Sequence, residues 1–515
     1  MGWINRTDYH NQAQSFSPCI TTTILFVRNN GKDLAKRSEI FPQPPERLSS
    51  LNLRNVFSFV GPGLIIASVT IGSGELVWAS RAGAVFGYQL LWCFLLAGIF
   101  KAVQVYGAVR HFTLTGEHPI VSWKAIPGPP LWFPLLITLP TVMVMPIAFS
   151  SISEILGGYL CELTGRSVNN NIAGLFSGFE FWENIFGGGV LTICLVLAIS
   201  STLKTLERVS AIVLGTLIVC AMISVVACQP SVIDIFAGLF IPFVPDYKPW
   251  VVTEYANTFS DRSPWLEVAL YLSAVGGGTF DYIGYVGMIR EKKWGLAGST
   301  VASRDQLELI DKNQVVRAKI WTRAAMFDTG FSFLSVILVT LLFAVLGALL
   351  LHTEHRIPDN TTLLSEQATF LTQLHPWLLW LYPAGVFLAF IGTLYGAFEI
   401  YRYTVVESAR ALLPKWTTDK HVPIWRNLTV AYCYGGGIIM IWLPKQLAGD
   451  VLGRMTFGAV IGGAALCGLW CFAMLWTNHV RLPRILRMSW LLWVSTLIAG
   501  IVMTALGIQT LLVYF

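Results

Sequence analysis

The sequence predicts an all-α membrane protein with many transmembrane helices, arranged as two inverted repeats. Hydrophobic residues make up 54% of the 515 residues and charged residues only 12%, about half the charged share of an ordinary soluble domain. Uncharged runs such as 376–398 and 488–515 are long enough to cross a bilayer. Two predicted spans carry a glycine cluster followed by an acidic residue, at corresponding places in the two halves. This composition excludes a soluble enzyme.

The apolar runs divide the chain into a tail and a helical domain. Residues 1–55 are polar and contain prolines, and their longest apolar stretch, 20–27, is too short to span a bilayer. We expect them to form a disordered cytoplasmic tail. Residues 56–513 are predicted to form an eleven-helix transporter domain, with a first repeat at about 56–228, a second at about 265–477 and an extra helix at 488–513. The expected spans are 56–80, 84–109, 131–160, 185–203, 209–228, 265–289, 328–351, 376–400, 428–443, 455–477 and 488–513.

The basic residues predict the orientation of these spans. With the tail inside, the tail and the inner loops hold 27 of the 35 Lys and Arg, and the outer segments hold 7. An excess of Lys and Arg marks cytoplasmic loops. We therefore expect an integral protein of the plasma (inner) membrane with a cytoplasmic N-terminus and an external C-terminus.

The two interrupted spans are the candidate site. In the first, Gly72-Ser73-Gly74 stands in mid-span directly before Glu75, and in the sixth, Gly276-Gly277-Gly278 precedes Asp281 by three residues. Backbone can unwind at such glycines where a water-lined cavity satisfies its polar groups. Glycines that only allow close helix packing are the alternative, but an acid inside a membrane is costly and marks function. Asp281 has a second interpretation, as a cap of the following half-helix.

At these positions the sequence resembles the Nramp family of proton-coupled divalent metal transporters, over most of residues 56–513. The family's Asp-Pro-Gly-Asn signature falls on residues 72–75, and its Met-Pro-His-Asn signature on residues 280–283. Glu154 matches an acidic position of the third helix, and Asp328 the start of the seventh. The resemblance implies a LeuT-like fold of five plus five inverted helices with an eleventh appended. It also implies secondary active transport of a cation, a divalent metal ion, by alternating access, with Glu75, Glu154 and Asp281 as candidates for a proton pathway.

The chain departs from the family at the metal ligands. Gly72 removes one ligand that the family supplies, Glu75 replaces another, and Phe280 removes the thioether. The remaining candidate metal ligands are Glu75 and Asp281. A carboxylate site without sulfur favours hard ions over soft ones. The family histidine is replaced by Tyr282, so proton coupling would depend on carboxylates.

A shorter resemblance supports a second candidate function. The segment 70–74 is similar to the Gly-Ser-Gly break of amino acid-polyamine-organocation transporters, which hold a substrate carboxylate on unwound backbone amides. A transporter of an amino acid-like organic solute on the same fold is therefore the alternative. Under both hypotheses the expected substrate-binding residues are Gly72, Ser73, Gly74, Glu75, Gly277, Gly278, Phe280 and Asp281.

Other features argue against further functions. The sequence contains no HExxH, G-x-S-x-G or P-loop motif, so we expect no enzyme activity and no cofactor. The dispersed basic residues do not indicate nucleic-acid binding. The expected partners are the lipid bilayer and a small-molecule or ion substrate. Lys101 lies within the second span, where we expect its side chain to extend to the membrane interface, with a counter-ion role as the alternative.

Overall fold

The computed structural model describes residues 39–49, 52, 57–166, 177–200, 203–260, 262–358, 363–367 and 381–514. Most of the predicted tail, residues 1–38, lies outside them. Residues 39–49 correct that prediction, because they are packed against the helical domain. Phe41 is buried, and its backbone N–H donates to Gln314 Oε1 at 2.6 Å. Leu48, in the short helix α2 (Glu46–Ser49), is also buried, so burial of two apolar side chains holds this end of the tail.

The first half of the chain forms five long helical segments. The first is α4, followed without interruption by η1 and α5, and the other four are α6, α8, α9 and α10. Their bounds are Pro62–Thr70 for α4, Ile71–Ala79 for η1, Ser80–Phe86 for α5, Leu91–Thr115 for α6, Trp132–Leu163 for α8, Gly178–Ser200 for α9 and Leu203–Ala227 for α10.

The second half repeats this pattern and adds a last helix. It begins with a broken pair, α14 and α15, and α17 runs on into η3, as α23 runs on into η6 and α24. The bounds are Pro264–Ala274 for α14, Thr279–Lys292 for α15, Lys312–Leu346 for α17, Gly347–Leu351 for η3, Leu381–Leu412 for α20, Val422–Ile441 for α21, Val451–Gly458 for α23, Ala459–Ala465 for η6, Leu466–Arg481 for α24 and Trp490–Tyr514 for α25.

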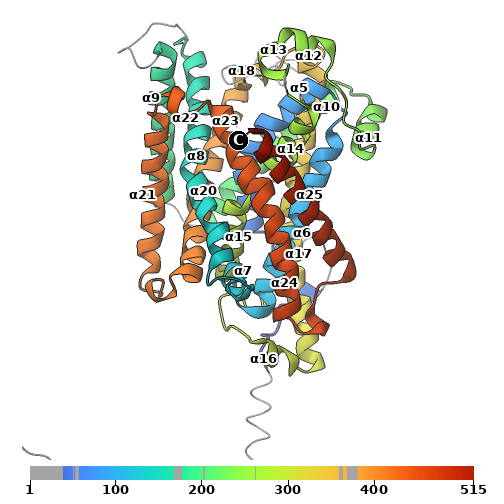
Figure 1. Ribbon diagram of the computed structural model, residues 1–515, viewed down its shortest axis with the longest axis vertical. Coiled ribbons are helices and arrows are strands. Elements are labelled where there is room, and N and C mark those ends of the chain that lie inside the picture. Colours follow the sequence, from blue (N-terminus) through green and yellow to red (C-terminus); the bar gives the residue numbers. More distant parts are fainter. Residues whose placement is uncertain are drawn as a thin grey trace, which may run out of the picture.

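Short helices connect these segments at the two ends of the bundle. They are α7 (Pro119–Ser122), η2 (Trp123–Ala125), α11 (Val232–Phe240), α12 (Pro249–Glu254), α13 (Ala256–Phe259), α16 (Arg304–Glu308), α18 (Leu363–Gln367), η5 (Pro414–Trp416), α22 (Lys445–Ala448) and η7 (Arg484–Leu486). Figure 1 shows α12 and α13 at the end of the molecule nearer the C-terminus, and α16 at the opposite end.

Seven helical segments of the described residues are long and apolar enough to cross a membrane, and the bent pair α4–α5 adds an eighth. The helices α10, α14–α15 and α21 occupy the other three predicted spans. The chain is therefore a helical membrane protein, and the number of eleven spans remains a prediction.

Helix packing places the two broken segments at the centre of the bundle. Helix α8 packs against α9 and α21, α6 against α17, and α15 against α20. In Figure 1 the group α8, α9 and α21 stands beside the rest.

Asp328 of α17 fixes the start of α4, because its carboxylate accepts the backbone N–H groups of Gly61 at 2.7 Å and of Gly63 at 2.9 and 3.1 Å. Tyr285 of α15 donates its hydroxyl to the same carboxylate at 2.7 Å. A helix N-terminus attracts negative charge and needs acceptors for its N–H groups, so Asp328 ties three elements together.

Candidate functional site

The glycine cluster between α14 and α15 is a true break in the helix. Gly276 and Gly277 have φ values of +80° and +81°, in a region that L-residues with a side chain rarely adopt. A Cβ at Gly277 would lie 2.7 Å from both Asp281 Oδ2 and Thr70 Cγ2. The backbone here therefore requires glycine for its conformation and for its close contacts.

The glycine cluster of the first span forms a different structure from the unwound backbone that the sequence suggested. Residues 71–79 form the π-helix η1. The axis of Pro62–Thr70 differs by 44° from that of Glu75–Phe86, a segment that includes the second part of η1. The N–H of Gly72 donates to Thr393 Oγ1 at 3.2 Å, and this hydroxyl donates to the carbonyl of Ser68 at 3.0 Å. A hydroxyl from α20 thus satisfies backbone groups where the helix widens, so no unwinding is needed. Single-turn π-helices often mark functional sites.

Glu75 joins the two broken segments. It is completely buried, and its Oε1 accepts the N–H of Gly276 at 2.9 Å. Its second oxygen, Oε2, has no hydrogen-bond partner among the described residues. One carboxylate oxygen therefore connects η1 to the α14–α15 break, and the other remains available.

Asp281 shows the same division between its two oxygens. Oδ2 accepts the N–H of Gly278 at 2.9 Å, which caps α15, so the expected capping role is confirmed. Oδ1 is buried and has no hydrogen-bond partner in the part of the chain that is described. The cap and a binding role are compatible, because each uses a different oxygen.

Lys101 does not extend to the membrane interface, which corrects the sequence-based expectation. Its side chain is completely buried. Its ammonium donates to the carbonyls of Ser273 at 2.7 Å and Gly277 at 2.8 Å, and also to that of Val275. Three carbonyls at the end of α14 satisfy a buried cation, and so the side chain points inward.

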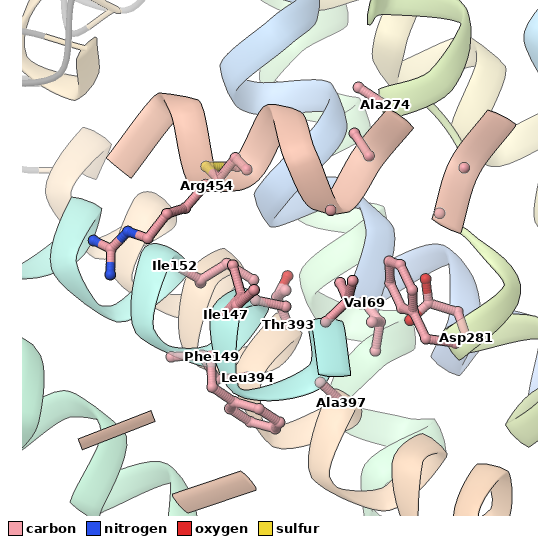
Figure 2. Close-up of a pocket in the computed structure, with 18 of the residues that line it drawn as sticks. Val69, Ile147, Phe149, Ile152, Ala274, Asp281, Thr393, Leu394, Ala397 and Arg454 are labelled. Carbon is pink, nitrogen blue, oxygen red and sulfur yellow. The ribbon is translucent and has the colours of Figure 1, made fainter. Parts of the chain in front are cut away.

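A cavity of about 70 Å³ lies beside the α14–α15 break. Its walls come from α4, η1, α8, α14, α15, α20, α23 and η6 and are mostly apolar. Figure 2 shows Asp281 at one end of this cavity and Arg454 at the other. Of the eight expected substrate-binding residues, Gly277, Phe280 and Asp281 line the cavity, whereas Glu75, Gly72 and Gly278 do not. Ser73 and Gly74 lie in η1, but the surroundings of these two residues fall outside the described parts.

Arg454 was counted in an outer loop from the sequence, but it lies in α23 and is only 5% exposed. Its guanidinium forms an ion pair with Glu154 of α8 and donates to Ser150 Oγ at 3.3 Å. Unpaired buried charges are costly, so Glu154 and Arg454 stabilise each other's burial. Glu154 Oε1 has no partner within the described ranges.

Sequence reasoning missed four residues that shape the site: Lys101 as an inward-pointing cation, Thr393, Arg454 and Met455. The last three all line the cavity. The position of Lys101 inside a predicted span was a usable signal, because such charges face the interior of a bundle. Arg454 stood one residue before a predicted span and was assigned to a loop. Nothing in the sequence around Thr393 or Met455 indicated their roles.

The donors available to a metal ion are few. The described residues contain no group of three or more His, Cys, Asp or Glu placed to hold a metal. Any cation at the cavity would be bound by carboxylate and carbonyl oxygens, with water completing its coordination. Met455 brings a thioether to the cavity wall from α23, so the site is not free of sulfur as the sequence suggested.

Comparisons with known proteins identify the family of the chain. The family model described as natural resistance-associated macrophage protein-like matches residues 63–513. The rice protein named metal transporter Nramp3 is 25% identical over 189 residues, 37% of this chain and 32% of that protein. Mouse natural resistance-associated macrophage protein 2 is 26% identical over 217 residues, 40% of this chain and 34% of that protein. The aligned segment thus spans about a third of the length of these curated relatives.

A solved structure extends the likeness to the whole fold. The manganese transporter of Eremococcus coleocola, in complex with an aromatic bis-isothiourea substituted compound, superposes with a TM-score of 0.54 at 12% identity. The match covers 92% of this chain and 90% of that one. The fold is therefore the predicted LeuT-like one, in an all-α membrane protein. From the family match over 63–513, the chain belongs to the natural resistance-associated macrophage protein-like (Nramp) family.

Proposed function

We propose that this protein is a secondary active transporter that moves a divalent metal cation across the plasma (inner) membrane by alternating access. The observation that carries the proposal is the Asp281 carboxylate at the α14–α15 break. It lines the cavity and has one oxygen without a partner among the described residues. Helices broken at the middle of a membrane protein are where transporters of inverted-repeat architecture bind their ions. Relatives of the chain are named metal transporters, which supports the same function.

The donor chemistry supports a hard divalent ion. Asp281 and, after a rotation of its side chain, Glu75 supply carboxylate oxygens, and Phe280 stands where the family pattern has a thioether. A cavity of about 70 Å³ has room for about two water molecules, each of which takes roughly 30 Å³. Ions such as Mg²⁺ release water reluctantly and keep several water ligands when they bind, so a partly hydrated ion fits. Met455 also lines the cavity, but it directly follows Arg454, whose positive charge repels a metal ion, at the end opposite Asp281 (Figure 2). We therefore infer a preference for Mg²⁺-like or Mn²⁺-like ions over Cd²⁺.

An amino acid-like substrate has less support. Its carboxylate would need backbone N–H groups at the breaks, but three of these are already bonded inside the protein. The N–H of Gly72 donates to Thr393, that of Gly276 to Glu75, and that of Gly278 to Asp281. To reach the N–H groups of Gly276 and Gly278, the carboxylate of a zwitterion would have to displace the Glu75 and Asp281 carboxylates, which carry the same sign of charge.

We further propose that protons follow the metal through carboxylates. Glu154 is buried in an ion pair with Arg454, which lines the cavity opposite Asp281. Acids inside a membrane commonly form proton relays.

We place the N-terminus in the cytoplasm and the C-terminus outside, and we propose that the protein is not an enzyme.

Calorimetric titration of the purified protein tests the substrate. We expect saturable heat with Mg²⁺ or Mn²⁺ and none with a panel of amino acids. The heat should disappear in Asp281→Asn and persist in Asp305→Asn, a change of an exposed carboxylate in α16. Saturation by an amino acid, with no heat from any divalent ion, would overturn the proposed function in favour of an organic solute.

A further inference from the structure

The environment of Lys101 is unusual for a lysine inside a membrane protein. Its ammonium carries three N–H donors, and the structure gives it three acceptors, all backbone carbonyls: Ser273, Val275 and Gly277. No side chain forms a hydrogen bond with this ammonium among the described residues. The ligand set is therefore a cage of carbonyl oxygens around one positive charge.

These carbonyls belong to the end of a helix that stops inside the molecule. Helix α14 ends at Ala274, so its last carbonyls have no intrahelical partner. The C-terminal end of a helix also carries partial negative charge and attracts cations. In transporters with broken helices, such ends and the neighbouring unwound carbonyls coordinate Na⁺ or a proton. The oxygens around Lys101 are thus the kind that would hold a free cation.

Glycines make room for the lysine at this position. A Cβ at Gly276 would lie 3.2 Å from Lys101 Cδ, and a Cβ at Gly463 of η6 would lie 2.0 Å from the carbonyl oxygen of Ser273, one of the three acceptors. Gly276 is also held in place from its other side, because Tyr282 donates its hydroxyl to the Gly276 carbonyl at 2.6 Å. The cage is therefore assembled by α14, α15 and η6 and filled by a side chain from α6.

We propose that Lys101 is a built-in cation, whose ammonium occupies a site for a compact monovalent cation formed by the carbonyls of Ser273, Val275 and Gly277. Because the lysine is covalently attached, this site is filled at all times. This consequence rests on the proposed function: the transported divalent ion needs no Na⁺ or K⁺ beside it at the break, because Lys101 already fills the monovalent site. Transport by the wild type is then independent of Na⁺ and K⁺.

Thermal unfolding of the purified full-length chain tests the cation site without reference to transport. The variant is Lys101→Met, which keeps the apolar part of the side chain and removes the ammonium. Melting is followed by intrinsic fluorescence of the 19 tryptophans. The salts, at equal ionic strength, are the chlorides of Na⁺, K⁺, methylammonium and the bulky N-methyl-D-glucamine.

We expect the wild type to have the same Tm in all four salts. Lys101→Met should melt lower in N-methyl-D-glucamine, because three buried carbonyls lose their partner. A saturable rise of about 2 °C or more should follow when Na⁺, K⁺ or methylammonium is added, since a ligand that binds only the folded state raises Tm. A response to methylammonium alone would show that the cage needs N–H donors, and a response to Na⁺ or K⁺ that it accepts a metal ion.

Two further variants complete the test. Lys124→Ala removes a lysine that is bonded to the Arg410 carbonyl, far from the break in sequence, and should show no dependence on the cation. Lys101→Ala leaves more space and should respond as Lys101→Met does. The proposal is overturned if both Lys101 variants melt at one temperature in all salts, or if neither folds in any salt, because the cage would then not accept a free cation. A cation-dependent Tm in a protein that binds no divalent ion would refute the proposed function and leave the Lys101 site intact.

Discussion

The acidic residues at the two breaks each divide their oxygens between structure and binding. Glu75 accepts the N–H of Gly276, and Asp281 accepts that of Gly278, while Glu75 Oε2 and Asp281 Oδ1 have no partner among the described residues. Of the two, only Asp281 lines the cavity. At the residue scale, Asp281 is therefore the stronger candidate for the metal ligand.

This difference predicts unequal effects of neutralising the two acids. In Asp281→Asn the amide oxygen can still accept the Gly278 N–H, so the protein should fold. Divalent uptake into liposomes should nevertheless fall more than about tenfold, because losing a metal ligand is at least as costly as losing a contact that supports one. Glu75→Gln should reduce uptake less. Unchanged uptake in Asp281→Asn at every pH tested would exclude it as a ligand.

Phe280 predicts the metal preference. Its ring contacts that of Tyr401 edge to face, with centroids 6.0 Å apart, and lines the cavity. Phe280→Met should raise uptake of Cd²⁺ relative to Mg²⁺ several-fold, because a thioether favours soft metals. Phe280→Leu is the matched control, since it removes the ring without adding sulfur. Equal selectivity in both variants would show that the side chain at 280 does not contact the ion. The variant Gly72→Asp would restore the other acidic ligand of the family, but it does not test selectivity cleanly, because the new Cβ would collide with Thr393.

At the scale of elements, the Glu154–Arg454 pair joins α8 to α23. Both side chains are almost fully buried, and removing one partner of such a pair typically costs about 3–5 kcal/mol. Glu154→Gln should therefore lower the Tm clearly, whereas the double variant Glu154→Gln with Arg454→Met should recover part of the loss. The exposed pair Arg304–Glu308 is the control, and its loss should cost under about 1 kcal/mol. A double variant less stable than both single variants would contradict mutual stabilisation.

The α14–α15 break predicts a strict requirement for glycine. Gly277→Ala forces a side chain into a left-handed conformation, which costs about 1–2 kcal/mol, and brings its Cβ against Asp281 and Thr70. Both Tm and divalent uptake should fall. Gly435→Ala in α21, where a Cβ would meet no atom within 4 Å, should leave both unchanged. Wild-type uptake in Gly277→Ala would mean that the break tolerates another backbone conformation.

For the molecule as a whole, the two ends of the bundle should face opposite sides of the membrane. The segment around α16 and the segment 241–248 before α12 are both exposed at described positions such as Asp305 and Lys248. With Asp305→Cys and Lys248→Cys, a membrane-impermeant thiol reagent added to intact cells should label only the second. The unsubstituted protein, with its native cysteines, gives the background. Labelling of Asp305→Cys from outside would reverse the orientation that the Lys and Arg count predicts.

Local patterns predicted the architecture of the molecule. Apolar run length and low charge indicated a helical membrane protein, and the glycine clusters with their acids located the two special segments. The resemblance of residues 72–75 and 280–283 to family signatures led to the Nramp family and the LeuT-like fold, which the comparisons confirm. The span count and the orientation remain predictions.

The tertiary structure decided which groups meet at the site. Lys101 finds its three carbonyls more than 170 residues away, and Arg454 meets Glu154 across 300 residues. Thr393 of α20 stabilises the π-helix η1 across 321 residues. Hydropathy and glycine spacing report only on a residue's neighbours in sequence, and so they locate helices and breaks. Whether a buried charge points outward or inward depends on which partner the packed helices bring to it, because the free energy of burying that charge depends on the partner.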